Sequence, residues 1–249
     1  MKHLGRHPKS FPKSDMPSLY HALRSLREQA KTIPACTPLR YVPTPEDAKH
    51  SPKAPLQGTL CYHDNQCVVV TDPFRKSQVH CIVMPWDTSL KSLNDVDGSK
   101  HLGLLEHMNN VGKQYAEFIR GGNGSDGSSA SSSSSTTNPY SNLRMLCGYH
   151  SIPSLPMLHM HLISLDLESA RLKSKTHYNT FATYYFLPAD MVVEDVKKHG
   201  VVTLNQDVDR LEKLAAQPMV CLWCGIDLKN MPHLKEHIPS CPKNMSRGV

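Results

Sequence analysis

The stretch Met157-Leu158-His159-Met160-His161-Leu162-Ile163 alternates with a period of two residues, and the fold can be worked out from it. In a β-strand this period places His159 and His161 on one face and Leu158, Met160 and Leu162 on the other. The apolar face can pack against a helix, which leaves two imidazoles side by side on the opposite surface. Paired histidines on a strand occur on plain protein surfaces and in metal sites as well as in catalytic sites, so the pair alone leaves all three open.

The flanking sequence predicts further strands and helices, which together define an α+β fold. β-forming runs beside polar turns indicate strands, and apolar side chains at helical spacing indicate helices. Strands are expected over residues 59–72 (a hairpin around Asp64-Asn65), 79–85, 143–150 and 157–164. Amphipathic helices are expected over residues 18–30, 101–119 and 190–199.

Composition excludes two classes of protein and suggests how the chain is divided. The 249 residues carry a net charge of +6 and a mean hydropathy of −0.41. No apolar run reaches the roughly 18–20 residues that span a bilayer, and the basic N-terminus has no apolar segment of a secretory signal behind it. We therefore expect no membrane association. The expected parts are a disordered basic arm (1–17), an α+β domain (18–200) with a Gly/Ser-rich insertion at 121–139, and a linker with a cysteine-rich module (201–249).

The cysteine-rich module has the ligand spacing of a zinc site. Cys221, Cys224, His237 and Cys241 form a C-x2-C-x12-H-x3-C array, which predicts one tetrahedral, structural zinc ion per chain. Leu228 and Leu234 are expected to form its small core, and Pro239 is expected to interrupt its helix. The lysines around it, Lys229, Lys235 and Lys243, indicate a nucleic-acid contact surface, with protein binding as the alternative.

Several of these motifs together resemble the aprataxin branch of the histidine triad (HIT) superfamily of nucleotide hydrolases and transferases. The superfamily signature is His-φ-His-φ-His-φ-φ, where φ is apolar; Met157 occupies the first histidine position, and His159 and His161 occupy the other two. The branch is indicated by Gly148-Tyr149-His150-Ser151-Ile152-Pro153-Ser154, by residues 172–181 (LKSKTHYNTF), by residues 82–86 (IVMPW) and by the cysteine-rich module. The resemblance covers roughly residues 56–241.

The resemblance implies a HIT-type domain with a central antiparallel sheet, followed by a small zinc finger, and it assigns roles to individual residues. His159 would be the nucleophile, His161 a hydrogen-bond donor to phosphate oxygens and His150 a general acid. Asp72, Ser154 and His80 would hold the nucleotide. No catalytic metal is implied. Because the first histidine supports the nucleophile in the family, Met157 puts the orientation of His159 in question.

The implied substrate is a nicked or broken DNA duplex with a 5′-AMP left by abortive ligation, and the implied reaction removes that AMP during single-strand break repair. Lys173, Lys175, His177 and Lys235 would contact DNA, and Leu19 or Tyr20 would wedge against the terminal base pair. Ordinary solvated lysines and simple packing are the alternatives for these residues. We expect a monomeric, nuclear protein, with the cytoplasm as a second location, and no forkhead-associated domain in front of the HIT domain.

Two other functions stay open at this point. One is a HIT hydrolase of small nucleotides, such as dinucleoside polyphosphates or AMP-amides. The other is a non-enzymatic zinc-finger protein that binds DNA and carries a degenerate HIT domain. The finger and the basic stretch favour DNA over small substrates, and His150, His159 and His161 favour an enzyme over a degenerate domain. The sequence does not define the preferred lesion.

Overall fold

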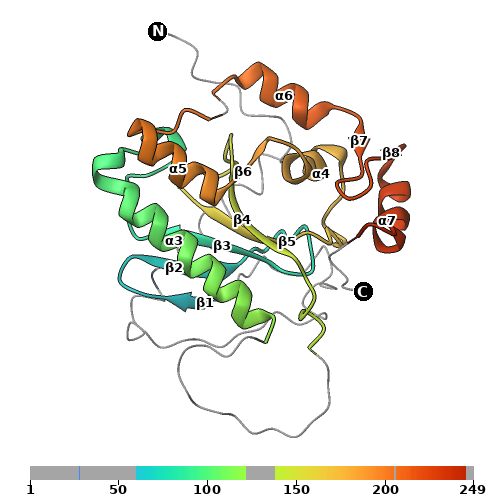
Figure 1. Ribbon diagram of the computed structural model, residues 1–249, viewed down its shortest axis with the longest axis horizontal. Coiled ribbons are helices and arrows are strands. Elements are labelled where there is room, and N and C mark those ends of the chain that lie inside the picture. The colour runs from blue at the N-terminus through green and yellow to red at the C-terminus, as the bar shows by residue number, and fades with distance from the viewer. Residues whose placement is uncertain (1–27, 29–59, 122–137, 205, 245–249) are drawn as a thin grey trace, which may run out of the picture.

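A six-stranded antiparallel sheet forms the centre of the protein (Figure 1). The computed structural model describes Glu28 and residues 60–121, 138–204 and 206–244. The strand order is β1-β2-β3-β5-β4-β6. The strands are β1 (Leu60–His63), β2 (Cys67–Thr71), β3 (His80–Pro85), β4 (Met145–His150), β5 (Met160–Ser164) and β6 (Phe186–Pro188). The expected hairpin, the third strand and the strand ending at His150 are thereby confirmed.

Two helices lie side by side across one face of the sheet: α3 (Gly98–Ile119) and α5 (Ala189–His199) (Figure 1). The predicted packing is confirmed, because Leu158, Met160 and Leu162 are buried in one core with the apolar side of α3. The start of α3 touches the end of α5, where the Gly98 N–H donates to the Gly200 carbonyl at 2.6 Å. A Cβ at Gly98 would lie 2.9 Å from the Gly200 backbone, so this contact requires glycine. A short 3₁₀ helix, η1 (Leu93–Asp95), precedes α3.

The histidine strand is shorter than the sequence predicts. Strand β5 begins at Met160, whereas 157–164 was expected. The preceding residues leave the ladder because the Leu158 N–H pairs with the Leu90 carbonyl of a loop, at 2.8 Å. The alternation of faces nevertheless continues through Leu158, so the period of two still predicts which side chains face the helix.

The basic stretch after β5, for which no secondary structure was predicted, contains helix α4 (Lys175–Ala182). The side chain of Ser174 caps it by accepting from the His177 N–H, which explains why the helix begins there. The segment expected as a linker contains a further helix, α6 (Val208–Ala216), which packs on α4. The Asn179 amide donates to the carbonyls of Ala215 and Gln217 and so satisfies the end of α6. Neither helix was predicted, and strand β6 was missed as well.

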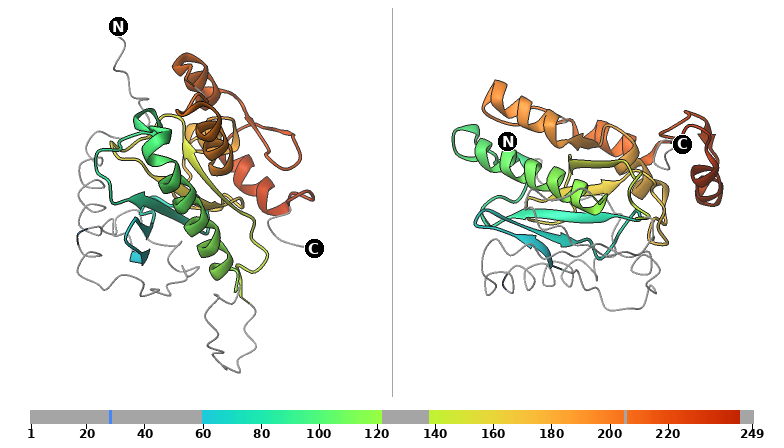
Figure 2. Two further views of the ribbon diagram at one scale, coloured as in Figure 1. Left: turned by 60° about the vertical axis from the view of Figure 1, so that its left-hand side comes forward. Right: turned by 60° about the horizontal axis from the view of Figure 1, so that its bottom comes forward.

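The C-terminal module consists of a hairpin, β7 (Met219–Val220) with β8 (Asp227–Leu228), and helix α7 (Met231–Ser240), at one end of the molecule (Figure 2). The expectation that Pro239 interrupts the helix is wrong, because α7 continues to Ser240 and Cys241 caps it. Proline is tolerated here because Pro239 lies one residue before the end of the helix, where it removes only the bond to the Lys235 carbonyl. No helix among the described residues is long and apolar enough to cross a membrane.

The module does not have a core of its own, in contrast to the prediction from Leu228 and Leu234. Both leucines belong to a buried cluster that also contains Ile163 of β5 and Phe186 of β6. The finger and the sheet therefore share one apolar core on the face opposite α3. The expected N-terminal arm, the helix over 18–30 apart from Glu28, and most of the Gly/Ser-rich insertion lie outside the described residues.

Candidate active site and zinc-binding cluster

Strand register brings three histidines together on the sheet face opposite α3. His161 of β5 pairs with Ile82 of β3 and Gly148 of β4, and His80 and His150 lie two residues along those strands. The ring centroid of His161 lies 4.5 Å from that of His150, 5.1 Å from that of His80 and 5.0 Å from that of His159. His161 is therefore the centre of a cluster of four imidazoles, which we call the imidazole cluster.

The imidazole cluster is covered, whereas the sequence predicted two histidines on an open surface. His80, His159 and His161 are only 1%, 4% and 5% exposed. Phe181 of α4 lies over the rings of His80, His150 and His161, and Phe186 of β6 lies against the last two. Gly148 makes room for Phe186, since a Cβ there would lie 2.5 Å from its ring. Neither phenylalanine was predicted as a site residue, because α4 and β6 were not predicted.

Burial keeps the imidazole cluster neutral. Desolvation lowers the pKa of His80 from 6.5 to about 4 and lowers the pKa values of His150 and His161 well below the usual range. The pKa of His159 is also lowered by burial, and its hydrogen bond to Met157 and the nearby Asp72 oppose this. At neutral pH each ring therefore has one N–H and one nitrogen lone pair.

The position of the proton on His159 follows from its partner. Its Nδ1 lies 2.8 Å from the carbonyl oxygen of Met157, which can only accept, so Nδ1 carries the proton. The remaining nitrogen, Nε2, then has a free lone pair and is the nucleophilic atom. Because a backbone carbonyl fixes this orientation, the side chain at position 157 is not needed for it. The doubt that Met157 raised about the orientation of His159 is thereby answered by the main chain.

A chain of hydrogen bonds sets the proton on His161. The Lys76 N–H donates to Nδ1 of His80 at 3.1 Å, so the proton of His80 is on Nε2. That Nε2 lies 2.9 Å from Nδ1 of His161, which therefore accepts and leaves the proton of His161 on its own Nε2. This Nε2 is buried, and no described residue pairs with it. A buried, unpaired N–H is costly, and an oxyanion bound there would satisfy it.

The nucleotide residues that the sequence predicts are only partly brought to the cluster. Asp72 is there: its Oδ2 lies 3.4 Å from Nε2 of His80, and its Oδ1 accepts from the Phe74 N–H. Ser154 lies half-buried in the loop between β4 and β5, and within the described residues it has no hydrogen bond to the imidazoles. Nε2 of His150 is buried without a partner, like that of His161.

A buried lysine beside the cluster was missed by the sequence analysis. Lys76, in the connection between β2 and β3, is 6% exposed, and its ammonium donates to the Phe74 carbonyl. Burial lowers its pKa to about 8, and its charge contributes to the lowered pKa values of His80, His150 and His161. A single lysine in a loop has no sequence pattern that separates it from a solvated one.

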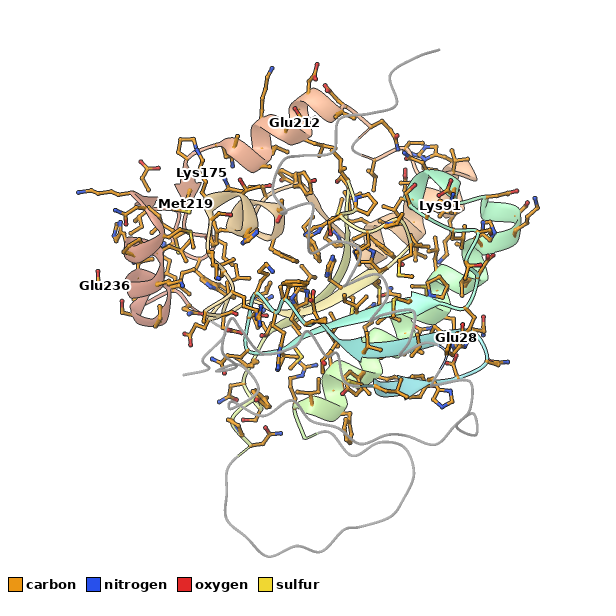
Figure 3. All side chains as sticks on the ribbon, turned by 180° about the vertical axis from the view of Figure 1, so that it is seen from behind. Glu28, Lys91, Lys175, Glu212, Met219 and Glu236 are labelled. Carbon is orange, nitrogen blue, oxygen red and sulfur yellow. The ribbon has the colours of Figure 1, made fainter. Side chains whose placement is uncertain are left out.

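Three of the lysines predicted to contact DNA are exposed. Lys173 and Lys175 are exposed at the start of α4, and Lys235 is exposed on α7. In Figure 3, Lys175, Met219 at the start of the finger and Glu236 of α7 lie on the same side of the molecule. His177 is half-buried, and burial together with Lys76 lowers its pKa to about 4, so it is neutral. Leu19 and Tyr20 lie outside the described residues.

The four predicted zinc ligands converge. The ligand atoms of Cys221, Cys224, His237 and Cys241 lie within 4.8 Å of one another. The Sγ atoms of Cys221 and Cys241 are 4.0 Å apart, and Cys224 Sγ is 3.3 Å from Nε2 of His237. Tetrahedral zinc with bonds of about 2.0–2.3 Å requires separations of roughly 3.5–3.8 Å, so the donor set fits the ion. Four protein ligands leave no open position, which defines a structural site.

Family comparisons agree with this architecture. Residues 49–177 match the family described as "Scavenger mRNA decapping enzyme C-term binding", a HIT-type domain, and residues 182–244 match the "C2HE / C2H2 / C2HC zinc-binding finger" family. The fold and the site therefore define a HIT-type domain joined to a zinc-binding finger.

Comparison with individual proteins shows which members of this class the chain resembles. Aprataxin of Gallus gallus is 38% identical over 177 residues, which is 71% of this chain and 49% of the relative. Aprataxin of Danio rerio is 34% identical over 185 residues, 72% of this chain and 49% of the relative. The chain belongs to the aprataxin family, and it spans about half the length of these curated relatives.

A solved structure has the same fold. The crystal structure of the aprataxin ortholog Hnt3 in complex with DNA superimposes with a TM-score of 0.52 at 25% identity, and the match covers 72% of this chain and 84% of the other. The predicted fold class, an α+β HIT-type domain with a C-terminal zinc finger, is thereby confirmed.

Proposed function

We propose that this protein removes AMP from adenylated 5′ ends of DNA through a covalent intermediate on His159. The observation that carries the proposal is the pair of free groups in the imidazole cluster: the lone pair on Nε2 of His159 and the unpaired N–H on Nε2 of His161. One is a nucleophile and the other is a donor for a phosphate oxygen, and both are set before any substrate binds. The relatedness to aprataxins supports DNA as the substrate.

In the first step, Nε2 of His159 attacks the phosphorus of the AMP group. The N–P bond forms, the phosphoanhydride P–O bond breaks, and its electron pair leaves with the 5′-phosphate of the DNA. His161 donates to a nonbridging oxygen of the AMP phosphate, which is the charge that the transition state must hold. Asp72, beside His80, is placed to accept hydrogen bonds from the ribose hydroxyls.

In the second step, water attacks the same phosphorus. The P–N bond breaks, its electron pair returns to Nε2 of His159, and AMP leaves while the proton of the water passes to solvent. His150 is neutral in the free protein because burial lowers its pKa. The anionic pyrophosphate linkage of a bound substrate would raise that pKa, so His150 would carry a proton that it donates to the departing oxygen of the 5′-phosphate in the first step. This supports the predicted role of His150 as the acid.

The zinc-binding finger has no step in this reaction. Cys221, Cys224, His237 and Cys241 would hold the ion, which supplies folding energy to the finger. Exposed Lys173, Lys175 and Lys235 would contact DNA phosphates on the side where α4 and the finger lie. A DNA substrate also supports the expected nuclear location.

The test is a comparison of substrates with trapping of the intermediate. The full chain is incubated with 5′-adenylated nicked duplex, with a diadenosine polyphosphate and with an AMP-amide, and release of AMP is measured. We expect the adenylated duplex to have the highest kcat/KM. Acid-labile, base-stable AMP should be recovered on the protein and mapped to His159. A preference for the small substrates would identify a nucleotide hydrolase, and release of AMP from none of them would leave a DNA-binding protein.

A further inference from the structure

Helix α4 touches the zinc-binding finger through Tyr178. The hydroxyl of this buried side chain donates to the Val220 carbonyl at 2.9 Å and accepts from the Leu222 N–H at 3.0 Å. These two backbone groups lie on either side of Cys221, one of the four zinc ligands. A single hydroxyl therefore holds the backbone turn that presents this ligand.

The same helix touches the imidazole cluster through Phe181. Its ring centroid lies 5.4 Å from those of His80 and His161 and 4.5 Å from that of His150. Phe181 follows Tyr178 by three residues, so both lie on one side of the helix. One turn of α4 thus separates the contact with the finger from the contact with the histidines.

The space between the two sites is filled by one apolar cluster. Cys221 and Cys241 are buried together with Ile163, Phe186 and Tyr178, and Phe181 packs against this group. Close-packed interiors do not absorb a shift at one end without a shift at the other. Opening the backbone turn at Cys221 would release Tyr178, and α4 would move Phe181 away from the imidazole rings.

We propose that Tyr178 is a positioning residue that makes the arrangement of the imidazole cluster depend on the folded zinc-binding finger. This inference rests on the proposed function, since the imidazoles concerned are those assigned to the reaction. The ion then supports the site through the protein, without contact with substrate. Because coupling between two sites is reciprocal, a nucleotide bound at the imidazole cluster should slow loss of zinc from the finger.

The experiment follows histidine ring nitrogens by NMR in the full chain, labelled with ¹⁵N-histidine and loaded with zinc. A chelator removes the ion, and zinc is then added back. We expect the ring signals of His150 and His161 to shift on removal and to return on addition. Tyr178→Phe keeps the aromatic ring and removes only the hydroxyl, so it should shift the same signals with zinc still bound. It should also weaken zinc retention by roughly tenfold or more, because it removes both hydrogen bonds of the hydroxyl.

Two further variants are matched to this change. Tyr149→Phe makes the same substitution at a buried tyrosine of β4 whose hydroxyl has no hydrogen-bond partner in the described part of the chain, so we expect it to change neither zinc retention nor the imidazole signals. Phe181→Leu should shift the imidazole signals and, because the coupling is reciprocal, should also weaken zinc retention, but by less than Tyr178→Phe does, since both hydrogen bonds to the finger remain.

Three outcomes decide the inference. Unchanged imidazole signals after zinc removal, together with unfolded finger signals, would overturn it. So would a Tyr178→Phe variant that loses zinc more readily while its imidazole signals stay in place. If the chain releases no AMP from adenylated DNA but its imidazole signals respond to zinc, the proposed function is wrong and the coupling stands.

Discussion

The zinc-binding finger and the imidazole cluster, both within the described residues, differ in what their nitrogen and sulfur atoms face. In the zinc-binding finger, the ligand atoms of three cysteines and His237 converge within 4.8 Å of one another. In the imidazole cluster, hydrogen bonds run from one ring to the next and end at a free lone pair on His159 and a free N–H on His161. The first arrangement can hold an ion, and the second leaves two nitrogens without a protein partner among the described residues, free for a reacting group. The hydrogen-bond partner of one ring nitrogen thus decides whether the other nitrogen of a histidine donates or accepts.

The clusters also differ in charge. The imidazoles are neutral without a ligand, because burial lowers their pKa values. Three thiolates held together without a metal would repel one another, so the finger depends on its ion. The imidazole cluster should thus be sensitive to substitution and to pH, and the finger to removal of metal.

The largest expected effect comes from removing the nucleophile. His159→Asn keeps a planar amide that can still bond the Met157 carbonyl, but it has no lone pair that attacks phosphorus. AMP release from adenylated DNA should fall on the order of a thousandfold or more, as measured in single-turnover assays. DNA affinity should remain close to wild type. Rapid turnover by this variant would assign the nucleophile elsewhere.

Loss of zinc should be the next largest effect. The purified chain should contain about one zinc ion, and Cys221→Ser should reduce the zinc content and unfold the finger. Zinc content by elemental analysis and protection of α7 from proteolysis measure this. Cys147→Ser is a matched control, since Cys147 is a buried thiol of β4 outside the four ligands. Full zinc content in Cys221→Ser would show that the assigned ligand set is wrong.

The imidazole cluster should make stability depend on pH in a defined direction. The folded-state pKa of His80 is about 4, below its ordinary value of 6.5, so the unfolded chain binds more protons between these two values. The resulting stability is fully present above pH 6.5 and is lost as the pH falls to 4. His80 alone contributes on the order of 3 kcal/mol to this fall, since each pKa unit corresponds to about 1.4 kcal/mol. Urea unfolding at pH 7 and pH 5 measures it.

A buried carboxyl opposes this trend and provides a control. Burial raises the pKa of Asp166 from 3.8 to about 6, so this group stabilises the fold at low pH and loses that contribution as the pH rises through 6. Its Oδ2 accepts from the N–H groups of Gln78 and Glu168, which an amide oxygen can replace. Asp166→Asn should therefore steepen the loss of stability between pH 6.5 and 4. A flat profile in both proteins would contradict the neutral imidazole cluster.

DNA binding should respond to salt through single lysines. Lys175→Gln removes an exposed charge at the start of α4, and we expect the slope of log affinity against log salt to fall by about 0.9, the value for one phosphate contact. Lys197→Gln is the control, because Lys197 lies on α5 and pairs with Glu106 and Glu194. Equal slopes in wild type and Lys175→Gln would show that Lys175 does not contact a DNA phosphate.

The smallest effect is expected at the first signature position. Met157→His restores the family residue, but the carbonyl of residue 157 already orients His159 whatever the side chain. The rate of AMP release should change by much less than about 10–100-fold, which is the usual loss when a residue that orients a functional side chain is mutated. A larger gain would show that the side chain, in addition to the carbonyl, orients the nucleophile.

Much of the fold could be predicted because its signals are local. The alternation around His159 assigned the sheet faces, and the periodicity of residues 101–119 gave α3. Helices α4 and α6 were not predicted because they are short and each buries only two side chains fully. Strand β6 has three residues, which is too few for a pattern. Pro239 was misjudged because it lies one residue before the end of α7, where few helical hydrogen bonds remain to be broken.

The site was predictable in its residue types and less so in its geometry. The resemblance implied His150, His159, His161, His80, Asp72 and Ser154, and the structure brings all of them together except Ser154, which in the described part of the chain has no hydrogen bond to the imidazoles. Lys76 and Phe181 carry no motif, and they reach the imidazoles only through the connection after β2 and the packing of α4.

The sequence alone determined the chemistry that this chain can offer: histidines on one strand face, and four zinc ligands at the spacing of a finger. Both are short-range properties, because the period of a strand and the reach of a C-x2-C turn are set by local backbone geometry. Only the tertiary structure decided that the histidines are buried and neutral, and which ring nitrogen of each one carries the proton. The physical reason is that burial and the bond that sets the His161 proton come from distant segments: His80 on β3 bonds His161 on β5, and Phe181 of α4 and Phe186 of β6 cover the rings.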